Sequence, residues 1–503
     1  MDLQTYMKLD AIDIAELIRM NEMTSADFLE LAFRRLNEVN SDLNAVVHDR
    51  KSRAVIEAKR NHGSQMFSGV PMLLKNLSQA VAGEYITSSS KLMKNMISEH
   101  DSNFVSRLRD AGFVFMGHTN TPEFGLKNIT EPKIYGPTRN PWNINHSAGG
   151  SSGGSASAIA SGVVPAAGAS DGGGSIRIPA SFTGLFGLKP TRGRTPVGPG
   201  SGRQWQGASI GFVLSRSVRD SAALLDVLQV VQPEAAFQTP LFPGEYKNLA
   251  DVGFEKPIRI AYSTKSPVGT SVSSDAHEAV LKTVRWLEKE GYNVEEKEND
   301  VDGVQLMQDY YMMNSGEISA LTSQLERSLG RALTPDDVEL ETWLLHKAGT
   351  SVLASDFSRS LASWDEATAK MEALHRTYDF FITPAAAYTA PEVGELTYSE
   401  DEQTGWRANM DKADKAEQQN IIWDLFLPSL TYTPFTQLAN LTGQPAMSVP
   451  VHLSKDGLPM GVQVMASKGK EDMLLKLAYQ MEQSDIWHGM TGNPMYKRWN
   501  SSL

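Results

Sequence analysis

The sequence predicts an α/β fold, in which strands and helices alternate along a chain of 503 residues. One observation behind this prediction is the order strand, helix, strand over residues 258–262, 275–291 and 292–296, where an amphipathic stretch lies between two strand-like runs. Another is the apolar run at residues 69–77, whose length and flanking glycine and proline are typical of a buried strand. The hydrophobic share of 41% is that of a globular protein with one large or two ordinary domains.

The other elements follow from the same periodicities. Residues 1–45 are expected to be helical, and Thr24 or Ser25 is the expected cap of the second helix. Apolar residues at helical spacing predict further helices at residues 104–111, 217–231, 334–348, 356–378 and 471–483. Short apolar runs predict strands at residues 113–116, 380–384, 444–450 and 461–466. Residues 232–256 are expected to form a connection, and the charged residues 393–420 are expected to be exposed.

A stretch rich in glycine and serine, residues 149–194, is the most unusual part of the chain. Two Gly/Ser turns, at residues 149–154 and 172–175, stand on either side of a segment of small residues that suits a short helix. Glycine is used where the backbone takes a positive φ or approaches a ligand closely. We therefore expect two loops that meet at one place, each presenting backbone N–H groups and hydroxyls.

Two other interpretations of this stretch are weaker. A flexible Gly/Ser linker lacks patterned apolar residues, whereas Ile159, Ile176 and Phe182 interrupt this stretch. A phosphate-binding loop of the Walker type ends in Gly-Lys-Ser or Gly-Lys-Thr, and that ending does not occur here.

Composition narrows the classes of function. The net charge of −12 argues against nucleic acid or an anionic membrane as the main partner. The chain has no cysteine, and its 10 histidines show no metal-ligand spacing, so we expect neither a metal nor a cofactor. The N-terminal segment does not have the pattern of a secretory signal, and no run of apolar residues is long enough to cross a membrane. The expected location is the cytoplasm.

Lys75 is the first chemical anomaly, because it lies inside the apolar run at residues 69–77. Lysine is seldom buried without a partner, and burial lowers its pKa, so a buried Lys75 could act as a base. A lysine on an edge strand that extends its ammonium into water explains the pattern equally well. The residues alone leave both interpretations open. A serine nucleophile here needs such a base, because no histidine is placed to serve it and no Gly-x-Ser-x-Gly elbow surrounds Ser175.

Residues 149–194 resemble the amidase signature family. The shared pattern is Gly-Gly-Ser-Ser-Gly-Gly-Ser, then Asp-Gly-Gly-Gly-Ser-Ile-Arg-Ile-Pro-Ala about twenty residues later, then Gly-Leu-Lys-Pro-Thr-Arg-Gly-Arg. The likeness extends to the lysine strand and to residues 443–446 and 461–463, whereas residues 232–400 match only loosely. Asn76 stands where the family more often has aspartate, and Gly172 where many members have a larger residue.

The resemblance implies a fold, a site and a reaction. The implied fold is a large mixed twisted β-sheet with helices on both faces. It would form one domain over residues 1–503, with N-terminal helices at 1–45, the signature core at 65–231, a variable and largely helical substrate region at 232–400, and the C-terminal part of the core at 430–490. The implied reaction is hydrolysis of a carboxylic amide through an acyl-enzyme.

The resemblance also assigns residues. Lys75 matches the family's base, Ser151 the serine that follows a cis peptide bond, and Ser175 the nucleophile. Backbone amides of Gly172, Gly173, Gly174 and Ser175 would hold the oxyanion. Ser152, Asp171 and Arg177 match positions that support the loop, and Asn314 aligns with a substrate-contacting position.

The substrate and the assembly are less defined. Several segments resemble the 6-aminohexanoate cyclic-dimer hydrolases within the family, which implies a small linear or cyclic aliphatic amide as substrate, and a homodimer is one open assembly. One rival is the amidase subunit of the glutamyl-tRNA amidotransferase, but residues 199–212 lack its acidic glutamine-anchoring pattern. A non-catalytic binding protein would not need Lys75, Ser151 and Ser175. A lipid-amide hydrolase would want an exposed apolar helix, and no stretch of the sequence is convincing as one.

Overall fold

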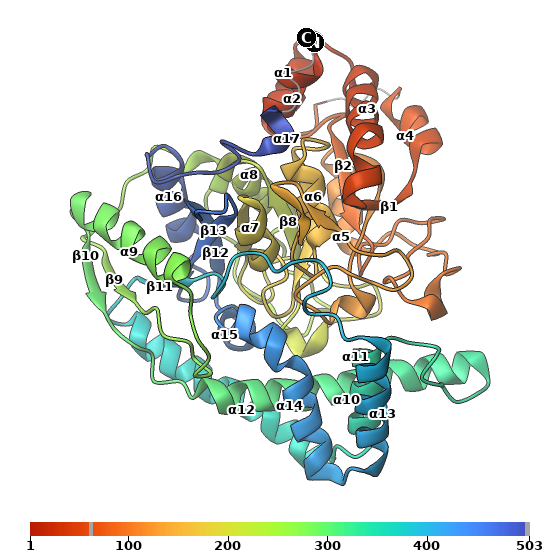
Figure 1. Cartoon of the computed structure of the whole chain (residues 1–503). Coiled ribbons are helices and arrows are strands. Elements are labelled where there is room, and N and C mark those ends of the chain that lie inside the picture. Colours follow the sequence, from red (N-terminus) through yellow and green to blue (C-terminus); the bar gives the residue numbers. More distant parts are fainter. Residues whose placement is uncertain (60–63, 498–503) are drawn as a thin grey trace.

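The structure is a computed structural model that describes residues 1–59 and 64–497 (Figure 1). Its centre is an 11-stranded mixed sheet with the strand order β1-β3-β2-β6-β8-β7-β12-β13-β11-β9-β10. These strands are β1 (Val46–Asp49), β2 (Pro71–Lys75), β3 (Val114–Thr119), β6 (Ala166–Asp171), β7 (Phe186–Lys189), β8 (Ile210–Ser215), β9 (Arg259–Tyr262), β10 (Asn293–Glu296), β11 (Phe380–Pro384), β12 (Ala446–Leu453) and β13 (Pro459–Ala466). A separate two-stranded sheet joins β4 (Arg139–Asn140) and β5 (Asn143–Ser147).

Helices lie on both faces of the large sheet (Figure 1), and the predicted fold class is confirmed. The helices are α1 (Leu3–Lys8), α2 (Ala11–Arg19), α3 (Ser25–Leu43), α4 (Lys51–Ala58), α5 (Asn103–Asp110), α6 (Gly153–Ala160), α7 (Arg177–Thr183), α8 (Val218–Leu228), α9 (Ser274–Lys289), α10 (Gly303–Leu329), α11 (Leu340–Gly349), α12 (Ala354–His375), α13 (Glu400–Lys412), α14 (Lys415–Tyr432), α15 (Gln437–Thr442), α16 (Glu471–Glu482) and α17 (Pro494–Lys497). The division of the chain into a core and a variable region stays a prediction.

The two faces of the sheet bury different residues of the same strands. Ile260 and Ile382 belong to the largest hydrophobic core, whereas Ala261 and Phe381 belong to a second cluster. Successive side chains of a strand point to opposite faces, so β9 and β11 each contribute to both cores. This two-sided burial is why their sequence is a continuous apolar run rather than an alternating one.

Three central strands, β6, β7 and β8, have no counterpart among the predicted strands. Every residue of β6 and β7 is buried, and β6 consists of small residues only, apart from its final Asp171. Small residues allow close packing: a Cβ at Gly168 would collide with the Gln79 side chain. A strand of this composition has neither an alternating pattern nor β-branched residues, and so it escapes pattern reading.

Helix α10 and its neighbours form a layer of their own beside the sheet, in the lower part of Figure 1. Helices α10, α11, α13 and α14 share a hydrophobic cluster that includes Tyr311, Leu344, Met410 and Phe426. Helices α11 and α12 match the helices predicted at residues 334–348 and 356–378, although α11 begins only at Leu340. Residues 393–420, expected to be exposed, contain α13 and the start of α14. Within the described residues, none of the helices has the length and apolar character needed to span a bilayer.

The N-terminal helices are fixed by local signals. Thr24 is the N-cap of α3: its side chain accepts a hydrogen bond from the Asp27 amide, and the Asp27 carboxylate accepts one from the Thr24 amide. This reciprocal capping box satisfies two amides at the start of the helix. It decides between Thr24 and Ser25 as the cap; Ser25 is the first residue inside the helix.

Candidate active site

Lys75 is the last residue of β2 and lies inside the sheet, between β3 and β6. Its side chain is 0% exposed, so the edge-strand interpretation is wrong. Its Nζ lies 2.8 Å from Ser151 Oγ and 2.9 Å from Ser170 Oγ. Burial lowers the pKa of Lys75 to about 7, although Asp171 acts in the opposite direction. A substantial fraction of the Lys75 side chains is therefore neutral near pH 7.

Ser151 lies between the Gly149–Gly150 turn and the start of α6. The Gly150–Ser151 peptide bond is cis, as the resemblance implies. Glycine is required at 150 because a Cβ there would come within 2.6 Å of the Ile129 carbonyl oxygen. Ser152 Oγ donates to the Ser170 carbonyl oxygen at 3.2 Å, and the Ser170 amide donates back to Ser152 Oγ at 3.3 Å. The first Gly/Ser turn is thus joined directly to the end of β6.

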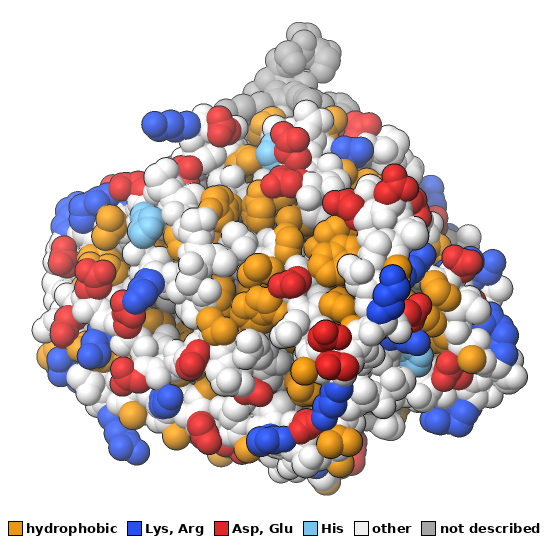
Figure 2. Space-filling model, turned by 60° about the horizontal axis from the view of Figure 1, so that its bottom comes forward, with side chains coloured by type: hydrophobic (Ala, Val, Ile, Leu, Met, Phe, Trp, Pro, Cys, Tyr) orange, Lys and Arg blue, Asp and Glu red, His pale blue; other side chains and the backbone are white. Residues whose placement is uncertain are grey.

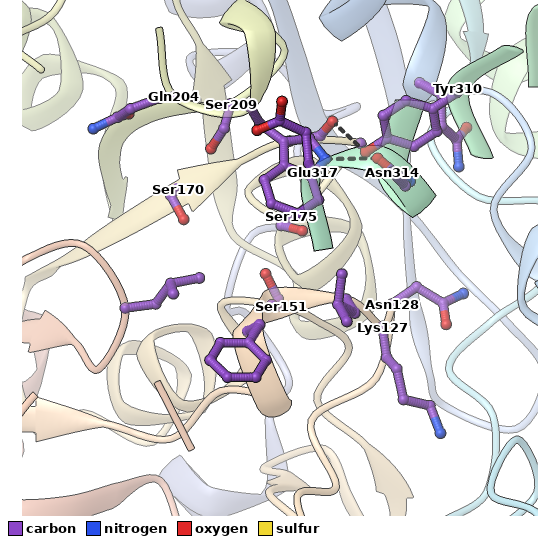
Figure 3. A pocket seen from close by; sticks show the side chains of 18 of the residues that line it. Lys127, Asn128, Ser151, Ser170, Ser175, Gln204, Ser209, Tyr310, Asn314 and Glu317 are labelled. Atoms are coloured by element: carbon purple, nitrogen blue, oxygen red, sulfur yellow. Dashed lines mark hydrogen bonds between the residues drawn. The ribbon is translucent and has the colours of Figure 1, made fainter. Parts of the chain in front are cut away.

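Ser175 lies in the second Gly/Ser turn, between β6 and α7, and is half-buried. Its hydroxyl makes no hydrogen bond to any residue that the structure describes. It lines the same cavity as Ser151 and Ser170. Figure 3 shows the Ser151 hydroxyl turned toward Ser175. The structure therefore brings Lys75 into contact with Ser151, and it brings Ser151 and Ser175 to one cavity.

Asp171 holds the turn that carries Ser175. Its carboxylate accepts the Gly174 amide at 2.7 Å and the Ile176 amide at 3.2 Å, and Arg177 donates to both of its oxygens at 2.9 Å. Both side chains are 0% exposed. Burial by itself would raise the pKa of Asp171, but the Arg177 charge and hydrogen bonds outweigh it and keep this pKa well below its usual range. A permanent buried ion pair thus fixes the turn.

The carbonyl groups of the turn are fixed from other elements. Tyr310 Oη, on α10, donates to the Gly172 carbonyl oxygen at 2.8 Å, and Thr436 Oγ1 donates to the Gly173 carbonyl oxygen at 2.7 Å. In a trans peptide the N–H points away from the C=O. The Gly173 amide therefore points away from Tyr310.

The hydrogen bonds of the turn reduce the set of backbone amides that can hold the oxyanion. The Gly174 amide is already bonded to Asp171, and Gly174 is not among the residues that line the cavity. Its φ of +127° and a Thr436 side chain where a Cβ would lie explain why the residue is glycine. Gly172, Gly173 and Ser175 do line the cavity, and no described residue accepts a hydrogen bond from their backbone amides. Fewer backbone amides are thus available to bind the oxyanion than the four that the resemblance implies.

The cavity has a volume of about 580 Å³ and is lined by both polar and apolar residues. The serines and glycines form its polar end, and aromatic and aliphatic side chains form much of the wall, namely Leu77, Met93, Phe124, Leu126, Ile178, Trp205, Met307, Tyr310, Tyr311, Leu321, Phe426 and Leu430. Asn314 also lines it, and its Oδ1 accepts from Trp205 Nε1 at 2.6 Å. Figure 2 shows hydrophobic side chains gathered near the centre of one face of the molecule.

Two residues of this site were not singled out from the sequence. Ser170 contacts the Lys75 amine, and Tyr310 holds the Gly172 carbonyl. Ser170 directly precedes Asp171, which the resemblance assigned to the loop, and this adjacency was the available signal. Tyr310 lies in the region that matched the family only loosely, and no local pattern indicates it.

Comparison with known proteins identifies the family of this chain. The family model described as Amidase matches residues 27–475. A lipoamidase from Enterococcus faecalis is 38% identical over 95% of this chain, which spans 64% of that protein's length. A 6-aminohexanoate-cyclic-dimer hydrolase from Pseudomonas sp. (strain NK87) is 36% identical over 95% of both chains.

Solved structures of amide hydrolases also resemble this chain. A structure of 6-aminohexanoate cyclic dimer hydrolase complexed with substrate is 34% identical, with a TM-score of 0.88 over 99% of this chain and 100% of that one. A bacterial aryl acylamidase of the amidase signature family, 24% identical with a TM-score of 0.81, shares the fold. The family model and the full-length likeness to an amide hydrolase together show that this chain belongs to the amidase family and is an amidase.

Proposed function

We propose that Lys75, Ser151 and Ser175 form a catalytic triad that hydrolyses a carboxylic amide through an acyl-enzyme. The observation that carries the proposal is the distance of 2.8 Å between Lys75 Nζ and Ser151 Oγ. Neutral Lys75 accepts a proton from the Ser151 hydroxyl, and Ser151 accepts one from Ser175. The Ser175 oxygen then attacks the amide carbonyl carbon.

The remaining steps use the same groups. The tetrahedral intermediate carries its negative charge on the former carbonyl oxygen, and the proposed donors to it are the amides of Gly172, Gly173 and Ser175. The C–N bond breaks as the relay returns a proton to the leaving nitrogen, which leaves an ester between the acyl group and Ser175. A water molecule that loses a proton to the relay cleaves this ester, so the products are a carboxylic acid and an amine.

We also propose an aliphatic amide, linear or cyclic, as the substrate. The apolar wall of the cavity supports this choice, since methylene groups gain free energy when they leave water for such a surface. The amides named for the two curated relatives agree with it. A small-molecule substrate fits a cavity of about 580 Å³.

The test of the reaction is the Ser175→Ala variant. Loss of the nucleophile should lower kcat on a panel of short aliphatic amides by about 10⁴-fold or more, as for other covalent catalytic groups. Mass spectrometry of wild type quenched during turnover should show the acyl group on the peptide that contains Ser175. Ser106→Ala, which removes a hydroxyl on α5 outside the cavity, is the control. Turnover that survives Ser175→Ala would exclude this mechanism.

A further inference from the structure

Glu317 is a charged residue of the cavity wall for which the proposed reaction has no use. It lies on α10, is half-buried and lines the cavity. Gln206 Nε2 donates to its Oε1 at 2.8 Å. Its other carboxylate oxygen has neither a hydrogen bond nor an ion pair with the described part of the chain. A carboxylate that lines a cavity with one free oxygen can accept a donor from a ligand.

Other charges near the cavity do not neutralise Glu317. Lys127 also lines it, but its Nζ lies 2.9 Å from Glu341 Oε1, and both side chains are largely buried. Figure 3 shows the Lys127 side chain extending away from Ser151 and Ser175. Burial raises the pKa of Tyr310 and of Tyr311, so both phenols are uncharged at neutral pH. Among the lining residues that the structure describes, Glu317 thus has the unpaired charge.

The carboxylate is also held in place. Gln204, Trp205 and Gln206 have φ values of 35°, 58° and 53°, a conformation that residues other than glycine seldom adopt. Two side-chain hydrogen bonds tie this loop to α10: Trp205 to Asn314, and Gln206 to Glu317. A group held by a helix on one side and by a tied loop on the other is preorganised for binding.

The position of Glu317 along α10 sets the distance between its carboxylate and the turn that carries Ser175. Tyr310, Asn314 and Glu317 all line the cavity, and their spacing places them on one face of the helix. Tyr310 contacts the turn that carries the nucleophile, and Glu317 is about 10 Å further along the helix axis, at 1.5 Å per residue. Asn314 lies between them on this face, and much of the rest of the cavity wall is apolar and aromatic, which suits a chain of several methylene groups.

We propose that Glu317 binds an ammonium group of the substrate, so that the enzyme selects amides with an amine separated from the scissile bond by several methylenes. This inference rests on the proposed amide hydrolysis. It adds that the substrate carries a positive charge and specifies how far that charge lies from the scissile bond. The ring of Trp205 lines the same wall and favours a cation, as does the net charge of −12. Glu317 is a specificity-determining residue, and it takes no part in the proton transfers.

Two matched pairs of amides test the proposal. The first pair is 6-aminohexanoyl para-nitroanilide and heptanoyl para-nitroanilide, in which a methyl group replaces the ammonium. The second is the hexanoyl amide of cadaverine and that of hexylamine, which puts the charge on the leaving group. A charge-assisted hydrogen bond in a half-buried site should favour the ammonium member of one pair by about 10- to 100-fold in kcat/KM. Added salt should lower this ratio.

The variants assign the preference to one side chain. Glu317→Gln keeps an acceptor for Gln206 but removes the charge, and it should bring the ratio within each pair close to one, mainly through KM. Glu326→Gln removes a charge from the same helix outside the cavity and should preserve the ratio. Melting temperatures of both variants show whether they fold.

Failure of this inference can be distinguished from failure of the proposed reaction. A wild-type ratio close to one in both pairs, or a preference that survives Glu317→Gln, would overturn the role of Glu317 while amide hydrolysis stands. If wild type turns over none of the four amides, calorimetry of 6-aminohexanamide and heptanamide binding to wild type and Glu317→Gln decides the matter. Tighter binding of the ammonium compound that is lost in the variant supports the role, and equal binding overturns it.

Discussion

The Tyr310 hydroxyl donates a hydrogen bond of 2.8 Å to the carbonyl oxygen of Gly172. Tyr310 belongs to α10, in the helical layer, whereas Gly172 begins the turn at the end of β6. This helix, which forms part of the cavity wall, thus also sets the direction of the Gly172–Gly173 peptide.

Tyr310→Phe tests this coupling. Without the hydroxyl, the Gly172–Gly173 peptide is free to rotate, and we expect kcat to fall about tenfold, the value of one ordinary hydrogen bond in the transition state. KM should change little. The Tyr311 hydroxyl has no hydrogen bond with the described residues, so Tyr311→Phe should have a smaller effect. An unchanged kcat for Tyr310→Phe would show that the turn keeps its shape without this contact.

The pH dependence of kcat/KM tests Lys75. Burial lowers the pKa of Lys75 to about 7, and only the neutral amine can accept a proton. Activity should therefore be low at acidic pH and rise through a limb centred near 7, with a slope of one proton. Lys75→Ala should lose this limb together with most of the activity. A limb that persists in the variant would belong to another group.

Ser170→Ala tests how the amine is oriented. A neutral lysine has two N–H groups and one lone pair, and a bond from one N–H to Ser170 Oγ turns the lone pair toward Ser151. We expect kcat to fall about tenfold with little change in KM. Ser170→Thr keeps a hydroxyl and should recover most of the activity. Equal losses in both variants would indicate packing rather than orientation.

Asp171→Asn tests the buried ion pair. The change leaves the Arg177 charge without its partner at a position that is 0% exposed. Breaking such a pair costs about 3–5 kcal/mol of the free energy of unfolding. Urea denaturation followed by circular dichroism measures this loss. Asp101→Asn, at the half-buried pair with Arg109, is the comparison and should cost less. Equal losses would contradict the role assigned to burial.

The fold could be predicted where strands and helices carry their own pattern. The strands β2, β9 and β11 were found because each is an apolar run with clear ends. The strand β6 was not found, because small buried residues pack well in the middle of a sheet without any periodic signal. The strands β7 and β8, in which a glycine interrupts larger apolar residues, were not found either. Their place follows from neighbours that lie far away in the chain.

For the site, too, some features could be predicted from the sequence and others could not. The sequence by itself determined the chemical groups: Lys75 in an apolar run, and Ser151 and Ser175 in two glycine-rich turns, are local patterns that backbone requirements impose. Only the tertiary structure decided that Lys75 is interior rather than at an edge, that the Gly174 amide is bonded to Asp171, and that Tyr310 and Glu317 face the cavity. Contacts between distant elements depend on how the sheet and the helical layer pack, and packing leaves no mark in the spacing of residues along one segment.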